Sequence, residues 1–363
     1  MSKLLLIRDK VFQNHLTPED HPESPKRLSA IDAAIDSRQL NLQIEKLAAK
    51  PASDDELCLV HAESYLHHLS KLEAEAKKRA AIVQLDPDTW MSPQSYEIAR
   101  LAAGAGVAAV ESLAANLQTV ETVHSLQNAF VAVRPPGHHA LRDRSMGFCL
   151  FNNVAIAAKK ARALPGIERV LIIDWDVHHG NGTQEMFYHD PSICFISLHQ
   201  FPNWPGTGWY KEDGTGDGRG FNLNIPLPPN TGDHGYLRAW QSLVEPVARE
   251  YKPQLILLSA GYDAHKDDPL AQQKISTNGY RMLAKRLQKL SVELKAPVLA
   301  LLEGGYNTGV LAQSVIVTIE ELIGKADEVN PELDEESHWQ RQQVDERIAE
   351  LRAHFSSYWN CLR

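Results

Sequence analysis

Short apolar runs along the chain predict the strands of a sheet. Most of these runs lack the alternation of apolar and polar positions that marks a strand with one solvated face. We therefore expect both faces of each strand to be buried, as in a parallel sheet. The runs are Lys3–Ile7, Ala129–Val133, Val170–Asp174, Ile193–Leu198, Leu255–Ser259 and Val298–Leu302.

Longer stretches between these runs predict helices. The first is rich in alanine, and the others separate successive strands. Strands that alternate with helices indicate one doubly wound α/β domain with a mainly parallel sheet. The predicted helices are Ser92–Ala115, Asn153–Ala163, Gly235–Tyr251 and Asn278–Leu294.

The remaining segments show no repeat and no break in composition. Gly206–Gly220 is rich in glycine and polar residues and is expected to be a long surface loop. The tail carries one apolar stripe at helical spacing, made of Ile348, Leu351, Phe355 and Trp359. We therefore expect a main domain at residues 1–325 and a helical extension at residues 326–363. The extension would pack on that domain or on a second subunit of a homo-oligomer.

Composition and charge indicate which kinds of partner to expect. Of the 363 residues, 43% are hydrophobic and 23% are charged, as in ordinary soluble globular chains. The net charge of −9 argues against a nucleic-acid partner, because phosphate contacts need clustered Lys and Arg. The same charge is compatible with a cationic substrate.

The cysteines and apolar segments bear on the compartment. The four cysteines are scattered without a CxxC pair, so we expect neither a disulfide framework nor a thiolate zinc site. The apolar start is too short for a secretory signal, and we expect no stretch that approaches a membrane span. These features favour a cytoplasmic protein without a membrane partner.

Polar clusters follow four of the predicted strands. Ligands of open α/β sheets bind beyond the carboxyl ends of the strands, so these clusters are expected to form one site. A single strand-end Asp often only caps a helix, but four clusters on one rim indicate chemistry. The clusters are RPPGHH at 134–139, DWDVHHGNG at 174–182, AGYD at 260–263 and EGGY at 303–306.

Three residues of these clusters predict a metal site. Asp176 and His178 are two positions apart, so both side chains point to the same face of an extended segment. Asp263, from another strand end, can complete an Asp–His–Asp set. Catalytic zinc keeps three protein ligands and one open position, and it can polarise a carbonyl. Cobalt or iron would fit the same ligands.

Other residues of the clusters suit acid–base catalysis. His138 and His139 are adjacent on a loop preceded by glycine, where both rings can approach one water. They could divide or share the roles of base and acid in amide hydrolysis. Asp174 and Asn181 are the available partners to orient the rings. The Tyr306 hydroxyl, after two glycines, is suited to donate to a developing oxyanion.

Several ordered motifs resemble those of one known family. That family is the histone deacetylases, which include bacterial acetylpolyamine amidohydrolases. The resemblance covers about Asp20 to about Gly309 and implies an arginase/deacetylase-like fold with an eight-stranded sheet. The motifs are HPESPKRL in the amino-terminal loop, then RPPGHHA, GFCLFNNVAIAA, DWDVHHGNGTQ, LSAGYDAH and LEGGYN.

The resemblance also implies a role for each residue of the clusters. The family hydrolyses N-acetyl amides with one zinc ion, which would be bound here by Asp176, His178 and Asp263. His139 would be the principal base, His138 its electrostatic partner and Tyr306 the carbonyl-polarising acid. The pairs would be His138 with Asp174 and His139 with Asn181. Asparagine at position 181 is similar to the class II branch.

Further residues match the family's substrate and potassium positions. Phe148 and Trp204 would wall the acyl tunnel, although Trp204 stands where the family usually has Phe. Gly147 would accept a hydrogen bond from the substrate amide, and Asp88 would grip substrate at the rim. The family's structural potassium ions would bind in two places here. One site comprises Asp174, Asp176, His178, Ser197 and Leu198, and the other comprises Phe187, Asp190, Ile193 and Phe221.

Two rival functions predict different residues. An arginase-like ureohydrolase shares this fold by resemblance but needs extra aspartates between two manganese ions. Here His178-His179 and Ala264-His265 stand at the corresponding positions, which favours one metal. A catalytically inactive binding scaffold would have lost Tyr306 or a ligand, and both are present.

The candidate substrates are acetylpolyamines, acetyl-lysine in proteins and other acylated amines. We favour acetylpolyamines, because carboxylates at a rim attract a polycation. Acetyl-lysine in proteins, as in histone deacetylases, is the alternative. Glu303 is expected only to accept a backbone hydrogen bond at its strand end. The acidic residues in predicted rim loops are Glu19, Asp20, Asp88, Asp267 and Asp268.

Overall fold

The computed structural model describes residues 4–38, 40, 44–119, 127–324 and 331–363. Its centre is an eight-stranded parallel sheet, in the order β2-β1-β5-β10-β9-β6-β7-β8. The prediction of a doubly wound, mainly parallel sheet of eight strands is confirmed. The strands are β1 Leu4–Arg8, β2 Ile44–Lys46, β5 Ala129–Ala132, β6 Val170–Asp174, β7 Ile193–Gln200, β8 Asn222–Leu227, β9 Leu255–Ala260 and β10 Val298–Leu302.

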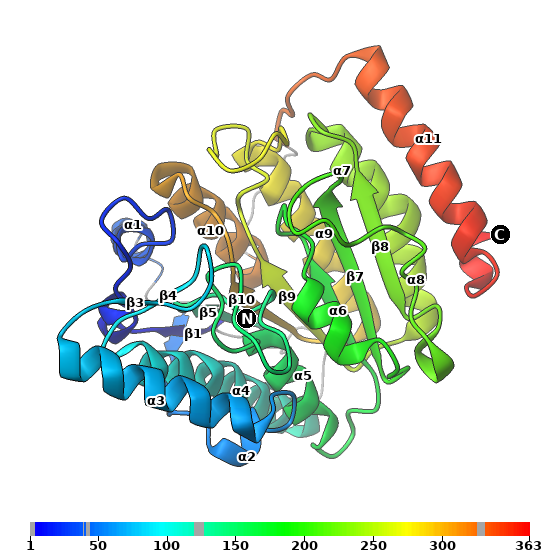
Figure 1. Cartoon of the computed structure of the whole chain (residues 1–363). Helices are drawn as coiled ribbons and strands as arrows, with labels where there is room; N and C mark the ends of the chain where they lie inside the picture. The colour runs from blue at the N-terminus through cyan, green and yellow to red at the C-terminus, as the bar shows by residue number, and fades with distance from the viewer. Residues whose placement is uncertain (1–3, 39, 41–43, 120–126, 325–330) are drawn as a thin grey trace.

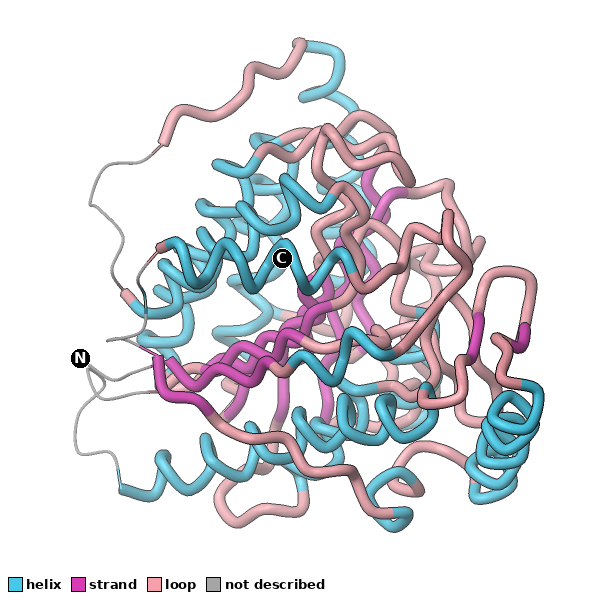
Figure 2. The backbone as a smooth tube through the Cα atoms, turned by 90° about the vertical axis from the view of Figure 1, so that its left-hand side faces the viewer, coloured by secondary structure: helices cyan, strands magenta, loops and turns pink. Residues whose placement is uncertain are grey.

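Helices cover both faces of this sheet (Figures 1 and 2). Helices α1, α10, α9 and α7 pack successively along one face, and α4, α5 and α6 along the other. A two-stranded antiparallel ribbon, β3 (Val83–Gln84) and β4 (Trp90–Met91), lies outside the main sheet. The helices are α1 Lys26–Ser37, α2 Asp54–Leu57, α3 Glu63–Arg79, α4 Ser95–Thr119, α5 Asn153–Arg162, α6 Asn181–Phe187, α7 Asp233–Ala239, α8 Glu245–Tyr251, α9 Thr277–Leu294, α10 Thr308–Ile323 and α11 His338–Phe355.

The two outer strands were not among the predicted runs. β2 contributes only one buried apolar side chain, Ile44, so it carries almost no hydrophobic signal. In β8, Asn222 and Asn224 alternate with apolar residues, and Pro226 lacks the N–H that a central strand needs. Both strands lie at the edges of the sheet, where such departures are tolerated.

The predicted element boundaries need small corrections. The helix expected at Gly235–Tyr251 begins at Asp233 and contains a π-helical turn at Trp240–Val244. In the strand expected at Lys3–Ile7, Lys3 lies outside the described residues. The loop Gly206–Gly220 is only partly a surface loop, because it holds a short 3-10 helix, and Asp213 within it is buried.

Helix α4 is long and apolar enough to cross a membrane by length and composition alone. From the sequence we predict no stretch that approaches a membrane span, and α4 departs from that prediction. The helix packs against α5, β5 and β10, and residues such as Ala102 and Val110 are fully buried. Core helices of compact domains pass the same test of length and composition.

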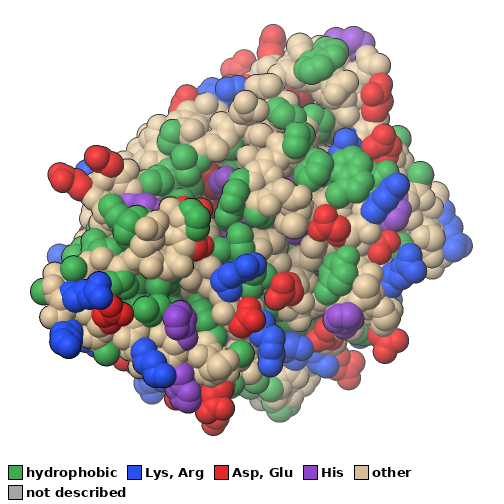
Figure 3. Space-filling model, in the orientation of Figure 1, with side chains coloured by type: hydrophobic (Ala, Val, Ile, Leu, Met, Phe, Trp, Pro, Cys, Tyr) green, Lys and Arg blue, Asp and Glu red, His purple; other side chains and the backbone are tan. Residues whose placement is uncertain are grey.

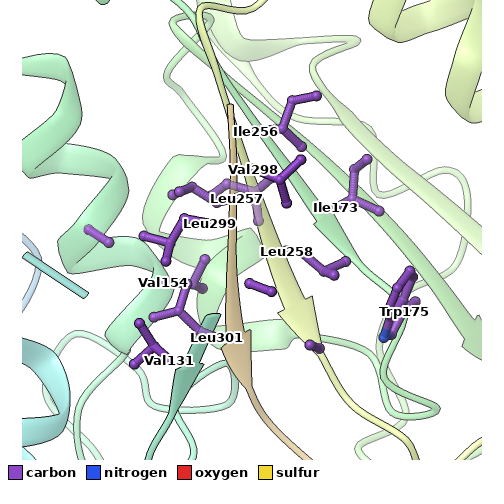
Figure 4. Close-up of a cluster of buried hydrophobic side chains, with 14 of the residues drawn as sticks. Val131, Val154, Ile173, Trp175, Ile256, Leu257, Leu258, Val298, Leu299 and Leu301 are labelled. Atoms are coloured by element: carbon purple, nitrogen blue, oxygen red, sulfur yellow. The ribbon is translucent and has the colours of Figure 1, made fainter. Parts of the chain in front are cut away.

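The hydrophobic core fills both sides of the central strands. Figure 4 shows Val131, Leu257, Leu299 and Leu301 from three adjacent strands within this core. These side chains are almost completely inaccessible to solvent. Burial on both faces explains why their strands lack alternating polarity. It also makes the strands a rigid base for the loops at their carboxyl ends.

The apolar stripe of the tail is buried against the same chain. Helix α11 contacts α7 and β8, and Figure 1 shows it along the outside of that end of the molecule. Two arginines of the helix reach backbone carbonyls, Arg347 at Pro226 and Arg352 at Ser242. The expected boundary at residues 325 and 326 lies outside the described residues.

Candidate active site

Neighbouring parallel strands end together at one edge of the sheet. Asp174, the last residue of β6, pairs in register with Ser259 of β9, and Ser259 pairs with Leu301 of β10. The loops after these three strands therefore start at the same level. This common level brings Asp176, after β6, close to Asp263, after β9.

These loops assemble the predicted metal ligands. One ligand atom from each of Asp176, His178 and Asp263 lies within 4.8 Å of the other two. The Nδ1 atom of His178 is 3.1 Å from Oδ2 of Asp263 and 3.3 Å from Oδ1 of Asp176. All three residues are largely or fully buried. Two carboxylates and one imidazole thus converge on one point.

The chemistry of this donor set fits a divalent cation. Burial, and then the neighbouring Asp176, raises the pKa of Asp263 to about 7, because two buried carboxylates repel each other. A cation between them would relieve this repulsion. Their other oxygens are already oriented, since Val177 N donates to Asp263 and Gly304 N donates to Asp176. The residues present therefore fit the zinc ion that the resemblance implies.

Glycine is required where the backbone passes the ligands. A Cβ atom on Gly304 would lie 2.2 Å from Oδ2 of Asp263, and one on Gly261 would lie 2.0 Å from Oδ2 of Asp176. Neither contact is physically allowed. The glycines of AGYD and EGGY thus let two loops close tightly around the carboxylates.

The tandem histidines stack next to this cluster, with ring centroids 3.8 Å apart. His138 Nδ1 lies 2.9 Å from Oδ2 of Asp174, and His139 Nδ1 lies 2.8 Å from Oδ1 of Asn181. These are the two pairs that the resemblance implies. Because both oxygens are acceptors, each Nδ1 donates, and Nε2 of each ring is turned away from its partner.

The surroundings of the two histidines give them opposite protonation states. Burial alone would lower the pKa of His138, but the carboxylates of Asp174, Asp176 and Glu303 together outweigh burial and raise the pKa to about 10. Burial lowers the pKa of His139 well below its usual value, and the charge of His138 lowers it further. At neutral pH, His138 is an imidazolium and His139 is a neutral base.

Glu303 supports the loop that carries these histidines. Its Oε2 atom accepts the backbone N–H groups of Gly137, at 2.6 Å, and His138, at 3.2 Å. The prediction that Glu303 accepts a backbone hydrogen bond is confirmed. A buried carboxylate thus joins the end of β10 to the loop after β5.

Aromatic residues surround the approach to the cluster. Trp204 meets His139 edge to face at 4.6 Å and is 41% exposed, while Phe148 meets Tyr306 edge to face at 5.7 Å. Oδ1 of Asp88 accepts the N–H of Gly147 at 3.2 Å. These contacts bring together the four residues expected to bind substrate and the expected acid, Tyr306.

A buried ionic network that the sequence did not single out lies behind the site. The carboxylate of Glu23 pairs with the guanidinium groups of Arg134 and Arg27, and all three side chains are inaccessible to solvent. Arg27 also donates to the backbone oxygens of Glu303 and Gly305. The only sequence signal was indirect: Glu23 and Arg27 lie in the HPESPKRL motif, and Arg134 follows β5.

Asp268 was expected among the carboxylates of the rim, and this expectation is wrong. The residue is only 6% exposed, and its oxygens accept backbone N–H groups, including that of Tyr306. Glu19, Asp20 and Asp267 are exposed, and Asp88 is half-buried. Sequence alone could not separate Asp267 from Asp268, because adjacent acidic residues look alike without their contacts.

The residues expected to bind potassium lie around β6 and β7. Asp174 and Ser197 are partners in register, and Leu198 follows Ser197 along β7. In the second set, Phe187 ends α6, and Asp190 pairs with Lys159 at 2.6 Å. Phe195 N, between the two sets, donates to Phe221 O at 2.9 Å.

The chain is similar to known proteins that are named as deacetylases. The family model described as histone deacetylase domain matches residues 21–322. A rice protein named "Histone deacetylase 10, chloroplastic" is 40% identical over 85% of this chain and 70% of its own length. The human "Polyamine deacetylase HDAC10" is 37% identical over 85% of this chain and 45% of its own length.

A solved structure shares the fold. The crystal structure of the HDA15 HD domain has a TM-score of 0.85 and 32% identity, with 100% of this chain and 97% of that chain covered. The chain therefore belongs to the histone deacetylase family of zinc-dependent deacetylases.

Proposed function

We propose that this enzyme removes acetyl groups from acetylpolyamines, with acetyl-lysine in proteins as the alternative substrate. The observation that carries the proposed chemistry is the convergence of Asp176, His178 and Asp263 beside the tandem histidines. Asp176, His178 and Asp263 would hold zinc. Zinc bound there would supply Lewis-acid polarisation of the acyl carbonyl and would make water more acidic.

The histidines carry the proton transfers. His139 Nε2 takes a proton from the attacking water as the water oxygen bonds to the acetyl carbon. Asn181 holds the His139 ring in the tautomer that leaves Nε2 free. The positive charge of His138, held by Asp174, stabilises the negative charge that develops on the acyl oxygen. When the carbon–nitrogen bond breaks, the amine leaves with a proton returned through His139.

Tyr306 stabilises the same oxygen. Burial raises the pKa of its phenol well above the usual value, so the hydroxyl stays protonated and remains a donor across the working range of pH. Its ring packs edge to face on Phe148 of the tunnel. The phenol would donate a hydrogen bond that strengthens as the oxygen gains charge.

Local carboxylates favour a polycationic substrate. Glu19, Asp20 and Asp267 are exposed, and Asp20 precedes His21, whose ring packs on Phe148 at 4.7 Å. Acidic and basic side chains are intermixed on the face in Figure 3, so the attraction must be local. Relatives named for both histone and polyamine deacetylation leave both substrates in consideration.

A substrate profile tests this preference. We expect kcat/KM for acetylspermidine and acetylputrescine to exceed that for acetyl-lysine peptides. Asp20→Asn should lower kcat/KM for acetylspermidine several-fold, about what loss of one local charge costs at low salt, and leave a neutral acetylated amide unaffected. A higher kcat/KM for the acetyl-lysine peptides would contradict the proposal and favour acetyl-lysine in proteins as the substrate.

Two structural potassium ions complete the proposal. The first set shares Asp176 and His178 with the metal ligands, and its members Asp174 of β6 and Ser197 of β7 are partners in register. The second, around Asp190 and Phe221, joins the end of α6 to the start of β8. Elemental analysis after dialysis into sodium and into potassium buffer should find bound potassium only in the second sample, with a higher melting temperature. Equal melting temperatures would count against these sites.

A further inference from the structure

We propose that Asp268 is a positioning residue that fixes the turn carrying Tyr306. The inference rests on the role proposed above for the Tyr306 phenol. The loop after β9 would then have two roles, because it supplies Asp263 to the metal site and Asp268 to the turn that carries Tyr306.

The turn joins β10 to α10 and has no regular structure of its own. Its first half is anchored by three contacts. Gly304 N donates to Oδ2 of Asp176 at 2.8 Å, and Tyr262 N donates to Gly304 O at 3.0 Å. Arg27 Nε donates to Gly305 O at 2.7 Å. Gly305 itself has a φ of +119°, which non-glycine residues rarely adopt.

Asp268 anchors the second half. Its Oδ2 atom accepts the N–H of Tyr306 at 2.6 Å and that of Asn307 at 3.1 Å, while Oδ1 accepts the N–H of Leu270 at 3.1 Å. Three backbone donors on one buried carboxylate are charge-assisted hydrogen bonds, which are about twice as strong as neutral ones. Both oxygens are thereby engaged, so Asp268 holds backbone rather than substrate.

The loop that carries Asp268 is itself constrained. Asp268 N donates to His265 O at 2.9 Å, and Lys266 N donates to Ile275 O at 2.8 Å. The side chain of Asn307 returns to the same loop and donates to Asp267 O at 2.9 Å. The two loops therefore hold each other through both backbone and side-chain contacts.

The contacts of the Tyr306 ring do not replace this anchor. The ring meets Phe148 edge on, and the Arg27 guanidinium carbon lies 5.1 Å from its centroid. Such contacts act on the ring and form no hydrogen bond with the backbone N–H of Tyr306. A shift of about 1 Å in a reacting group can cost roughly a hundredfold in rate. Asp268, in contrast, accepts a hydrogen bond from the backbone N–H of Tyr306 itself.

Asp268→Asn tests the anchor, with Asp55→Asn, at an exposed position of α2, as the control. Asparagine keeps the shape but turns an amide NH2 towards one of the backbone donors. Asp55→Asn removes the same charge from an exposed side chain that has no part in the site or its rim. Both should be measured on a neutral acetylated amide, so that attraction of a charged substrate plays no part. We expect Asp268→Asn to lower kcat by roughly ten- to a hundredfold with little change in KM.

Repeating Asp268→Asn in a Tyr306→Phe background separates positioning from general damage. Without the phenol there is nothing left to position, so the second substitution should cost less than about twofold. An equal loss in both backgrounds, or an equal loss in Asp55→Asn, would overturn the inference. Zinc content and melting temperature of each variant accompany the kinetics.

Asp268→Glu provides a second variant if Asp268→Asn does not fold. It keeps the charge and displaces the carboxylate by one methylene, so kcat must also fall. Unchanged kcat in folded Asp268→Glu would overturn the inference. Full activity of Tyr306→Phe alone would refute the role proposed for the phenol, whereas an inactive Tyr306→Phe beside a fully active Asp268→Asn would refute only the anchor.

Discussion

Single contacts distinguish residues that the sequence presents as equivalent. His138 and His139 are adjacent and identical in type, yet one Nδ1 meets the carboxylate of Asp174 and the other the amide of Asn181. A carboxylate partner stabilises the imidazolium, whereas an amide only orients the ring. The assignment of His139 as the base therefore depends on the oxygen that each ring meets.

His139→Ala should lower turnover by more than about a hundredfold, the scale of general-base catalysis. The zinc content should remain one per chain, because His139 is not among the three converging ligands. Turnover and elemental analysis on the same preparation check this prediction. His67→Ala, at an exposed position of α3, is the control. Loss of zinc from His139→Ala would contradict the separation of ligands from base.

Tyr306→Phe should remove only the hydroxyl. Loss of one preorganised donor costs about 3–4 kcal/mol of transition-state stabilisation, or roughly a hundred- to a thousandfold in kcat. KM should change much less, because the uncharged carbonyl of bound substrate accepts only a weak hydrogen bond. Steady-state kinetics and a thermal melt decide the matter. A lower melting temperature with near-normal kcat would make Tyr306 a packing residue instead.

At the scale of elements, buried ion pairs connect the amino-terminal segment to the strands. Burial alone would raise the pKa of Glu23, but Arg134, with smaller contributions from His15 and Arg27, outweighs burial and lowers the pKa from 4.5 to about 2. A carboxyl whose pKa falls on folding adds stability above its unfolded pKa, and this contribution disappears as the pH falls through the folded pKa. The stability that the Glu23 carboxylate contributes is therefore lost as the pH falls from 4.5 to about 2.

Glu23→Gln should therefore destabilise the protein by about 3–5 kcal/mol at neutral pH, because two buried guanidinium groups lose their partner. The difference from the wild type should shrink as the pH falls from 4.5 towards 2. Urea unfolding at several pH values measures both free energies. A difference that does not depend on pH would contradict the ionic role of Glu23.

Strands with many consecutive apolar residues could be predicted from the sequence, and strands with few could not. Strands buried on both faces, such as β9 and β10, appeared as apolar runs, whereas the short edge strand β2 did not. The strand-end motifs located the metal cluster because spacing determines which way side chains point. Contacts between distant segments were not predictable: Asp268 with Tyr306, and Glu23 with Arg134, depend on loop paths that no local pattern encodes.

At the scale of the molecule, the tail forms part of the folded unit that carries the site. We propose that residues 326–363 are an extension that stabilises the domain without entering the chemistry. Val344 and Phe355 of α11 are buried against the chain, whereas Trp339 of the same helix is 62% exposed. Residues of one helix therefore offer a matched test of this role.

Phe355→Ala should lower the free energy of unfolding by about 3–5 kcal/mol, the usual cost of removing a buried phenylalanine ring. Trp339→Ala should change it by less than about 0.5 kcal/mol, as for most exposed positions. Below the melting temperature, kcat of both variants should match the wild type. A large loss of kcat in folded Phe355→Ala would place the extension in the catalytic function.

The most direct test of the whole scheme is removal and return of the metal. Chelation followed by dialysis should abolish hydrolysis of an acetylated amine, and one equivalent of zinc per chain should restore it, because Asp176, His178 and Asp263 would hold a single ion. Asp263→Asn should weaken zinc binding and lower the rate together, since an anionic ligand becomes neutral. Full activity in protein shown by elemental analysis to contain no divalent metal would contradict the assignment.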